Sequence, residues 1–113
     1  MRLVTLAATQ FTCSWDLSRN AASAERVTRA AAAQGARIIL LQELFTRLYF
    51  CITQNYSPFG LAQPFENHPL LARFADLACE LGVVLPVTFF EMAGQAHFNT
   101  CAMIDADGTI LGQ

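Results

Sequence analysis

The sequence predicts an α/β fold, in which the strands of a partly parallel sheet alternate with helices. Two apolar stretches, residues 3–8 and 36–42, have the composition of strands that are buried on both faces. Between them lie the alanine-rich residues 18–34, whose composition favours a helix. A strand, a helix and a strand in this short span form a βαβ unit, which joins two parallel strands by a right-handed crossover.

The first predicted helix is followed by a glycine and a strand, and then by a long irregular segment. Gly35 is well placed as a left-handed cap at the end of the helix. Residues 46–66 contain proline, glycine and no helical or strand period. Loops of this length are usually functional or disordered. Five aromatic residues argue against disorder and favour a loop that packs over a pocket: Tyr49, Phe50, Tyr56, Phe59 and Phe65.

A one-sided apolar stripe predicts a second helix over residues 67–81. Asn67 is its expected N-cap, Pro69 stands in its first turn, and Gly82 ends it.

Three strands are predicted after this helix. Residues 83–90 are apolar, and the internal Pro86 indicates an irregularity in that strand. Residues 97–104 alternate like an antiparallel strand. A turn signal at residues 105–108 precedes a further strand that begins at Thr109.

The composition excludes several classes of protein. Hydrophobic residues make up 54% of the 113 residues and charged residues 14%, so the chain is too apolar to be disordered. A net charge of -2 gives no basic face for nucleic acid. The apolar runs are too short to span a membrane, and the N-terminus resembles a strand more than a signal peptide. We therefore expect a cytoplasmic protein.

The sequence shows no metal or cofactor motif. Cys13, Cys51, Cys79 and Cys101 stand singly, without a C-x-x-C pair, so we expect four buried core thiols. Two isolated histidines, His68 and His97, are expected to be structural, and the phosphate-binding and nucleophile-elbow motifs are absent. Residues 13–15 superficially resemble a thiol-protease site, but they have no suitable histidine partner.

Two glutamates occur where chemistry is expected. Glu43 follows the apolar residues 38–41, and α/β sheets bind ligands at the carboxyl ends of such strands. A partly desolvated carboxylate there would have a raised pKa and would act as a base near neutral pH. The alternative is a glutamate that caps a helix or reaches solvent. Glu91 follows Phe89 and Phe90, but a hairpin comes next, so Glu91 is more easily explained as solvated.

Residues 36–45 resemble the first catalytic segment of the nitrilase superfamily of carbon–nitrogen hydrolases, an apolar strand that ends in a glutamate. The resemblance covers essentially the whole chain, and it is strongest to the N-carbamoylputrescine amidase branch. The further segments that carry it are residues 7–10, 34–36, 49–51, 80–86, 89–91, 97–99 and 104–108.

This resemblance implies a cysteine hydrolase with a Glu-Lys-Cys triad. Glu43 would be the general base, the cysteine would attack a carbamoyl carbon, and the lysine would stabilise the oxyanion. The substrate would be a small carbamoyl-amine, N-carbamoylputrescine in the suspected branch, and no metal or organic cofactor is implied. Tyr49 matches the substrate-side segment, and Glu91 would be a secondary pocket carboxylate, whereas Asn99 is expected to fasten strands.

The resemblance also implies a four-layer α-β-β-α sandwich and a homo-oligomer for the full-length protein. The 113 residues include no lysine, and none of the four cysteines has the family's nucleophile context. We therefore expect residues 1–113 to be the N-terminal part of an incomplete domain, with the triad lysine and cysteine beyond residue 113. We also expect these residues alone to be inactive as an enzyme and prone to aggregate. The alternative is a small non-catalytic α/β binding module that uses the aromatic loop to dock a partner. Within the hydrolases, another carbamoyl-amine, an amide or a nitrile stays open as the substrate.

Overall fold

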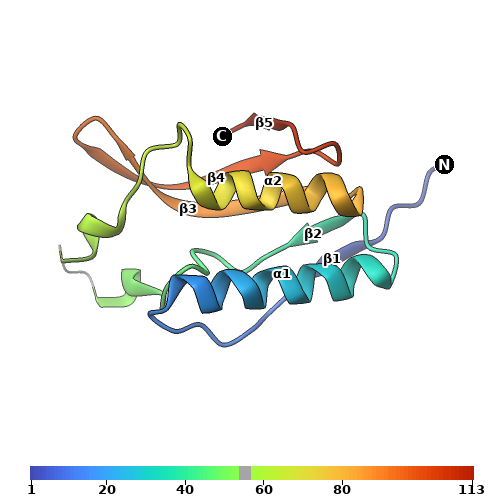
Figure 1. The fold of residues 1–113 in the computed structure, drawn as a ribbon, viewed down its shortest axis with the longest axis horizontal. Coiled ribbons are helices and arrows are strands. Elements are labelled where there is room, and N and C mark those ends of the chain that lie inside the picture. The colour runs from blue at the N-terminus through green and yellow to red at the C-terminus, as the bar shows by residue number, and fades with distance from the viewer. Residues whose placement is uncertain (54–56) are drawn as a thin grey trace.

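The structure is a computed structural model that describes residues 1–53 and 57–113. Tyr56, one of the aromatic residues of the predicted loop, lies outside the described residues. The elements follow the predicted order (Figure 1). They are β1 (Leu6–Ala8), α1 (Leu17–Ala33), β2 (Ile38–Leu40), the 3-10 turns η1 (Phe50–Thr53) and η2 (Ser57–Leu61), α2 (Pro69–Leu81), β3 (Leu85–Ala93), β4 (Ala96–Ile104) and β5 (Ile110–Gly112).

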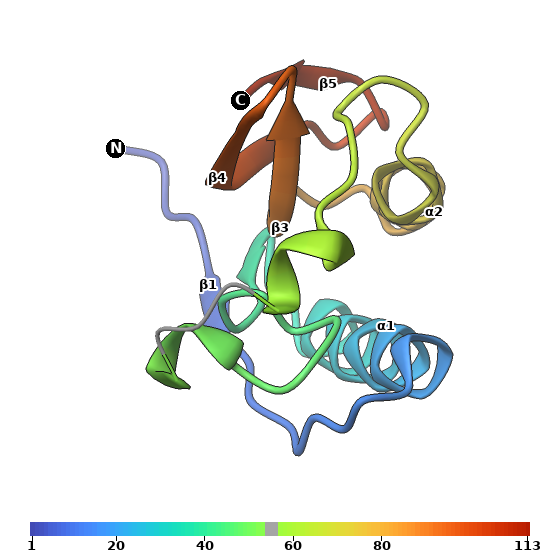
Figure 2. The ribbon, with the colours of Figure 1, turned by 90° about the vertical axis from the view of Figure 1, so that its left-hand side faces the viewer.

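The strands form two small sheets that a parallel bridge joins into one strand layer. β1 pairs with β2 in parallel, as the predicted βαβ unit requires, and β3, β4 and β5 pair antiparallel. The bridge connects Ile38 to Val84: the N–H of Val84 donates to the carbonyl of Arg37 at 2.8 Å. Both helices lie on the same side of this layer (Figure 2). We call the opposite side the outer face.

The first helix begins and ends as predicted. The Asp16 carboxylate accepts from the N–H of Arg19 at its start. At its end Gly35 adopts a φ of 92°. The N–H groups of Gly35 and Ala36 then reach back to the carbonyls of Ala32 and Ala31, which is the paired bonding of a Schellman cap.

The N-cap of the second helix differs from the prediction. His68 caps α2, because its Nδ1 accepts from the N–H of Leu70 at 3.2 Å, and Asn67 instead takes a φ of 57°. The reason is Pro69 at the first helical position, which holds the preceding residue in an extended conformation suited to an N-cap. Burial lowers the pKa of the His68 imidazole, which favours the neutral form that accepts this bond. The predicted Gly82 end is confirmed by a φ of 64°.

The core lies between the strand layer and the two helices. Its largest buried side chains include Phe45, Phe74 and Phe89. The rings of Phe45 and Phe74 meet edge to face with centroids 5.5 Å apart, a favourable aromatic geometry. Phe45 comes from the loop after β2 and Phe74 from α2, so this contact fixes the loop against the second helix.

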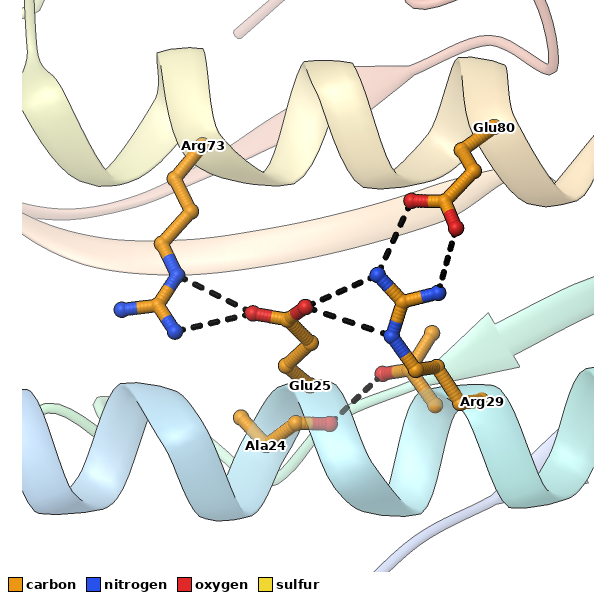
Figure 3. Close-up of polar contacts among 6 residues, drawn as sticks. Ala24, Glu25, Arg29, Arg73 and Glu80 are labelled. Atoms are coloured by element: carbon orange, nitrogen blue, oxygen red, sulfur yellow. Dashed lines mark hydrogen bonds and ion pairs between the residues drawn. The ribbon is translucent and has the colours of Figure 1, made fainter.

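Four charged residues join the two helices at the surface (Figure 3). Glu25 of α1 accepts from Arg73 of α2 at 2.8 Å and from Arg29 of its own helix at 2.9 Å. Arg29 also reaches Glu80 of α2 at 2.7 Å. The hydrogen bonds from Arg73 and Arg29 lower the pKa of Glu25, and the bond from Arg29 lowers the pKa of Glu80.

The expectation that the first two strands are buried on both faces is wrong. Ile39 and Leu41 are in the core, but Leu6 is 68% exposed and Leu40 is 49% exposed. Within the described residues the helices cover one face of the strand layer only, so every second side chain of β1 and β2 points away from them.

Two smaller expectations also fail. Pro86 causes no irregularity, since β3 and β4 stay in register throughout, and the register shift lies between Met103 and Ile104 instead. The cysteines are not core thiols: Cys51, Cys79 and Cys101 are exposed and Cys13 is half-buried. The positions of the three exposed thiols, in η1, on α2 and on β4, have no covering layer in the described chain. In residues 1–53 and 57–113, no helix is long and apolar enough to cross a membrane.

Candidate active site

The backbone around Glu43 is sharply turned and firmly held. Leu44, the next residue, has a φ of 49°, which is uncommon for a residue with a branched side chain. Its side chain is buried, and its N–H donates to the Thr88 hydroxyl oxygen on β3 at 2.8 Å. Strain of this kind persists only where the surroundings impose it. The chain therefore turns at the end of β2 in a defined way, with Glu43 at the turn.

Two polar side chains meet the Glu43 carboxylate. Asn99 of β4 donates from Nδ2 to Glu43 Oε1. Tyr49 comes from the loop that follows β2, and its hydroxyl lies beside the same carboxylate. The negative charge of Glu43 and a hydrogen bond to it raise the pKa of the Tyr49 phenol, with a smaller effect from Cys51.

The structure thus brings together Glu43 and Tyr49, two of the three site residues named from the sequence. It adds Asn99, whose side chain was expected to fasten strands and instead bonds the carboxylate. The expected partial desolvation of Glu43 is wrong, because its side chain is exposed. On the side where Glu43 and Asn99 meet, no α-helix of the described residues covers the strand layer, and only the loop after β2 packs there, with Phe50 on Phe90.

Asn20 and Gln42 hold the segment around Glu43, and the sequence prediction missed both. Asn20 of α1 is buried; its Nδ2 donates to the carbonyls of Ser14 at 2.7 Å and Thr46 at 2.9 Å. Gln42 exchanges two hydrogen bonds with the Phe11 backbone, at 2.8 and 2.9 Å. The available signal was an asparagine on the buried face of an alanine-rich helix, where a polar group needs partners.

Cys13 lies next to this segment and has a structural environment. Its thiol donates to the carbonyl of Phe45 at 3.2 Å. Burial raises the thiol pKa, and a hydrogen bond from Gln42 offsets part of that effect. A raised pKa leaves little thiolate near neutral pH, which is the form that attacks. These contacts agree with the interpretation that Cys13 is not a nucleophile.

Glu91 does not join the Glu43 site. It is 6% exposed, and it accepts from the Thr100 hydroxyl at 2.6 Å and from the Gln113 amide at 3.1 Å. Side chains alternate along a strand. Glu91 therefore shares the helix-side face with Val87 and Phe89, whereas Asn99, paired with Phe90, lies on the outer face. The interpretation of Glu91 as a solvated residue is wrong, and its carboxylate faces away from Glu43.

The aromatic loop is packed and not free, as expected, and the β3–β4 hairpin is the surface on which it packs. Phe59 stacks on His97 with ring centroids 4.7 Å apart, and Phe50 lies 5.0 Å from Phe90. The N–H of Gln63 donates to the carbonyl of Phe90 at 3.0 Å.

Two hollows border this loop. One of about 330 Å³ lies between the loop and the start of α2; its lining includes Leu44 and His68 but not Glu43, Tyr49 or Asn99. Tyr49 instead borders a second hollow of about 350 Å³, together with Trp15 and Pro58. A pocket under the loop therefore exists, but the Glu43 carboxylate does not line it.

No cluster of three or more metal-ligating side chains occurs in the part of the chain that the structure describes. The site consists of one carboxylate at the end of a strand, held by neutral donors. Such a group is suited to proton transfer at a reaction centre that other residues complete.

Residues 5–113 match the family model described as carbon-nitrogen hydrolase, and the chain belongs to the carbon–nitrogen hydrolase family. The chain is 57% identical over 111 residues to the N-carbamoylputrescine amidase of Solanum lycopersicum, covering 98% of this chain and 37% of that protein. It is also 40% identical over 112 residues to the citrullinase of Francisella tularensis, covering 99% of this chain and 39% of that protein.

A solved structure shows the same fold. The carbon-nitrogen hydrolase of Helicobacter pylori G27 superposes with a TM-score of 0.84 at 24% identity, covering 96% of this chain and 38% of that one. The predicted family and the predicted portion of the nitrilase fold are confirmed. The chain spans little more than a third of the length of the relatives it matches.

Proposed function

We propose that this chain is part of an enzyme that hydrolyses the carbon–nitrogen bond of a carbamoyl-amine, with N-carbamoylputrescine as the substrate. The products are putrescine, carbon dioxide and ammonia. The observation that carries the proposal is the Glu43 carboxylate, placed at the end of β2 and bonded by Asn99 on the outer face. The identity to amidases that bear this substrate in their name supports the choice of substrate.

Glu43 acts as the general base. It accepts the proton of a cysteine thiol, which the family resemblance places outside residues 1–113, as the sulfur attacks the carbamoyl carbon. The proton then passes to the amine nitrogen, which leaves as putrescine. In the second half of the reaction Glu43 takes a proton from water, whose oxygen attacks the carbamoyl carbon. The carbon–sulfur bond then breaks, Glu43 returns the proton to the sulfur, and carbamic acid is released. Carbamic acid decomposes to carbon dioxide and ammonia.

Tyr49 supports this role as a neutral residue beside the base. Its raised pKa keeps the phenol protonated at physiological pH, so it remains a hydrogen-bond donor toward Glu43 or a substrate. Glu91 as a pocket carboxylate, a cytoplasmic location and a homo-oligomeric full-length protein stay predictions. The position of Glu91 on the helix-side face disfavours contact between it and a substrate bound at Glu43.

A chimera tests the proposal. Residues 1–113 replace the matching segment of the Solanum lycopersicum amidase, and release of putrescine and ammonia from N-carbamoylputrescine is measured. We expect turnover by the chimera and none by residues 1–113 alone. Replacing Glu43 by glutamine should lower kcat by about 10²- to 10⁴-fold, the usual contribution of a general base. Glu66→Gln, at an exposed position outside the site, is the matched control.

Three outcomes would contradict the proposal. One is a folded chimera that does not hydrolyse N-carbamoylputrescine, and another is a Glu43→Gln chimera that keeps the parent rate. The third is turnover by residues 1–113 alone, because the chain contains no lysine for the oxyanion. A monomeric, cooperatively folding chain that binds a partner through the aromatic loop would favour the non-catalytic module instead.

A further inference from the structure

We propose that Asn99 is a positioning residue, which holds the Glu43 carboxylate in the one orientation that suits proton transfer. This inference rests on the proposed function, because it assigns Glu43 the role of base. Its starting observation is the bond from Asn99 Nδ2 to Glu43 Oε1. The bond connects residues 56 positions apart, and both side chains are exposed.

The chemistry of the pair fixes the direction of the bond. An ionised carboxylate only accepts hydrogen bonds, so the amide must present its nitrogen rather than its oxygen. Asn99 thereby holds one carboxylate oxygen, Oε1, and so limits the rotation of the group that is proposed to accept the proton. An amide cannot take up the proton itself at physiological pH, so it orients the base without competing with it.

The β3–β4 hairpin provides a rigid support for this contact. Asn99 pairs with Phe90 in an uninterrupted ladder that runs from Leu85 to Ala93. Thr88 lies two residues from Phe90 on the same face and accepts the N–H of Leu44. The hairpin thus holds the backbone after Glu43 through Thr88 and the side chain of Glu43 through Asn99.

Asn99 is needed in addition to the backbone contact because Glu43 is exposed. Thr88 and the buried Leu44 fix the backbone, but a long exposed side chain still rotates about its own bonds. A misplacement of about 1 Å at a reacting group costs about 100-fold in rate. The side-chain contact with Asn99 therefore acts on the rate of proton transfer and not on the folding of the strand.

The test uses the chimera with three replacements at position 99 and one control. Asn99→Leu keeps the size and removes the donor, and Asn99→Asp keeps the shape and adds a charge that repels Glu43. Asn99→Gln keeps the amide one methylene further out. Gln95→Leu, an exposed amide at the tip of the same hairpin, is the matched control.

We expect Asn99→Leu to lower kcat by about 10- to 100-fold, with KM changed less than about threefold and Tm unchanged within about 2 °C. Asn99→Asp should lose at least as much, Asn99→Gln should recover part of the rate, and Gln95→Leu should match the parent. An unchanged kcat in Asn99→Leu would overturn the proposal. A higher KM at constant kcat would indicate a substrate contact, and a lower Tm at constant kcat would indicate a strand fastener; either result also overturns it.

Failure of the proposed function is recognised separately. If the parent chimera hydrolyses an amide, a nitrile or another carbamoyl-amine instead, the substrate proposal fails and the Asn99 comparison is made on that compound. If it hydrolyses none of them, crystal structures of the parent and Asn99→Leu chimeras compare the Glu43 side chain directly. We expect the carboxylate to leave its position in the variant, and an unmoved carboxylate would overturn the role of Asn99.

Discussion

Replacing Asn20 by leucine is expected to weaken the fold and the site together, because this side chain links α1 to the loop that carries Glu43. Asn20 is 1% exposed. Its Oδ1 accepts the N–H of Ser14 at 2.9 Å, and its Nδ2 donates to the carbonyls of Ser14 and Thr46. Thr46 is three residues from Glu43, so the loss of this bond frees the segment that carries Glu43.

The magnitude follows from the groups that lose their partner. Leucine has a similar volume but no polar atom, so one backbone N–H and two backbone carbonyl groups lose this partner in a partly buried place. The Ser14 hydroxyl also loses its bond to Asn20, but it keeps the bond that it accepts from the Asp16 N–H, so it is left out of the sum. Each such group costs about 1 to 3 kcal/mol when it is buried. Because these groups are only partly buried, we take about 1 kcal/mol for each, or about 3 kcal/mol in total. In a large domain this corresponds to a fall in Tm of about 6 to 12 °C.

Thermal denaturation of the chimera, together with kcat for N-carbamoylputrescine, provides the assay. Asn20→Asp separates the contributions, because its carboxylate still accepts from Ser14 but cannot donate to Thr46. We expect it to lie between the parent and Asn20→Leu in Tm. Arg26→Gln, at an exposed position of the same helix, is the control. A change in Tm below about 2 °C for Asn20→Leu would refute the reasoning.

Four further outcomes are expected. Gly108 has a φ of 86°, and a Cβ there would lie 2.8 Å from the Ala75 carbonyl oxygen, so Gly108→Ala should cost about 2 to 4 kcal/mol of unfolding free energy in the chimera. Gly60→Ala is the control: a Cβ there meets open space and φ is ordinary, so the unfolding free energy should hardly change. Equal losses of stability in the two variants would contradict this account. The pKa of Glu25 is lowered in the folded state by its arginine partners, so its stabilisation is complete above the ordinary value of 4.5 and is lost as the pH falls through the lowered folded pKa. Urea denaturation should therefore give Glu25→Gln a lower unfolding free energy than the parent at pH 7, and this difference should shrink below pH 4.5. A difference that stays constant with pH would exclude the ion pairs as its cause. The raised pKa of Cys13 predicts slower alkylation than at the exposed Cys79, measured by peptide mass spectrometry, and faster labelling of Cys13 would contradict the buried thiol. Residues 1–113 alone should aggregate through the outer face, and a monomeric light-scattering mass with a reversible thermal transition would count against this expectation.

The elements that the sequence predicted well are those whose signals are local. The Gly35 and Gly82 helix ends follow from the conformations that only glycine adopts easily. The βαβ unit follows from the order of its parts, and Ile38, which pairs with both Leu6 and Val84, shows the expected parallel neighbours. The N-cap of α2 failed because two local signals competed, and the proline at position 69 decided between them.

Burial was predicted less well, because it depends on what covers a strand and not on its composition. Leu6, Ile39 and Leu40 belong to equally apolar runs, yet only Ile39 lies in the core. The cysteines failed for the same reason: a residue type that is usually buried stays exposed where no second layer packs on it, as at Cys101 on β4. The family fold predicted such a second layer, and composition alone did not reveal which face it would cover.

The two candidate glutamates, Glu43 and Glu91, differ in the face of the strand layer on which their carboxylates lie. Glu43 and Glu91 both come after apolar strands, and the sequence distinguished them only by the hairpin that follows Glu91. The alternation of side chains along β3 places Glu91 on the helix-side face, together with Leu85, Val87 and Phe89. A carboxylate on that face finds partners within the same sheet, as Glu91 does with Thr100 and Gln113. Glu43 instead meets Asn99 on the outer face, where no α-helix of the described residues lies above the sheet. Alternation from Ile39 and Leu41 would place Glu43 on the helix-side face as well. The chain turns after β2, where Leu44 takes a φ of 49°, and this turn brings Glu43 to the outer face. The turn, and not the alternation along a strand, therefore leaves Glu43 where a nucleophile from outside this chain can reach it.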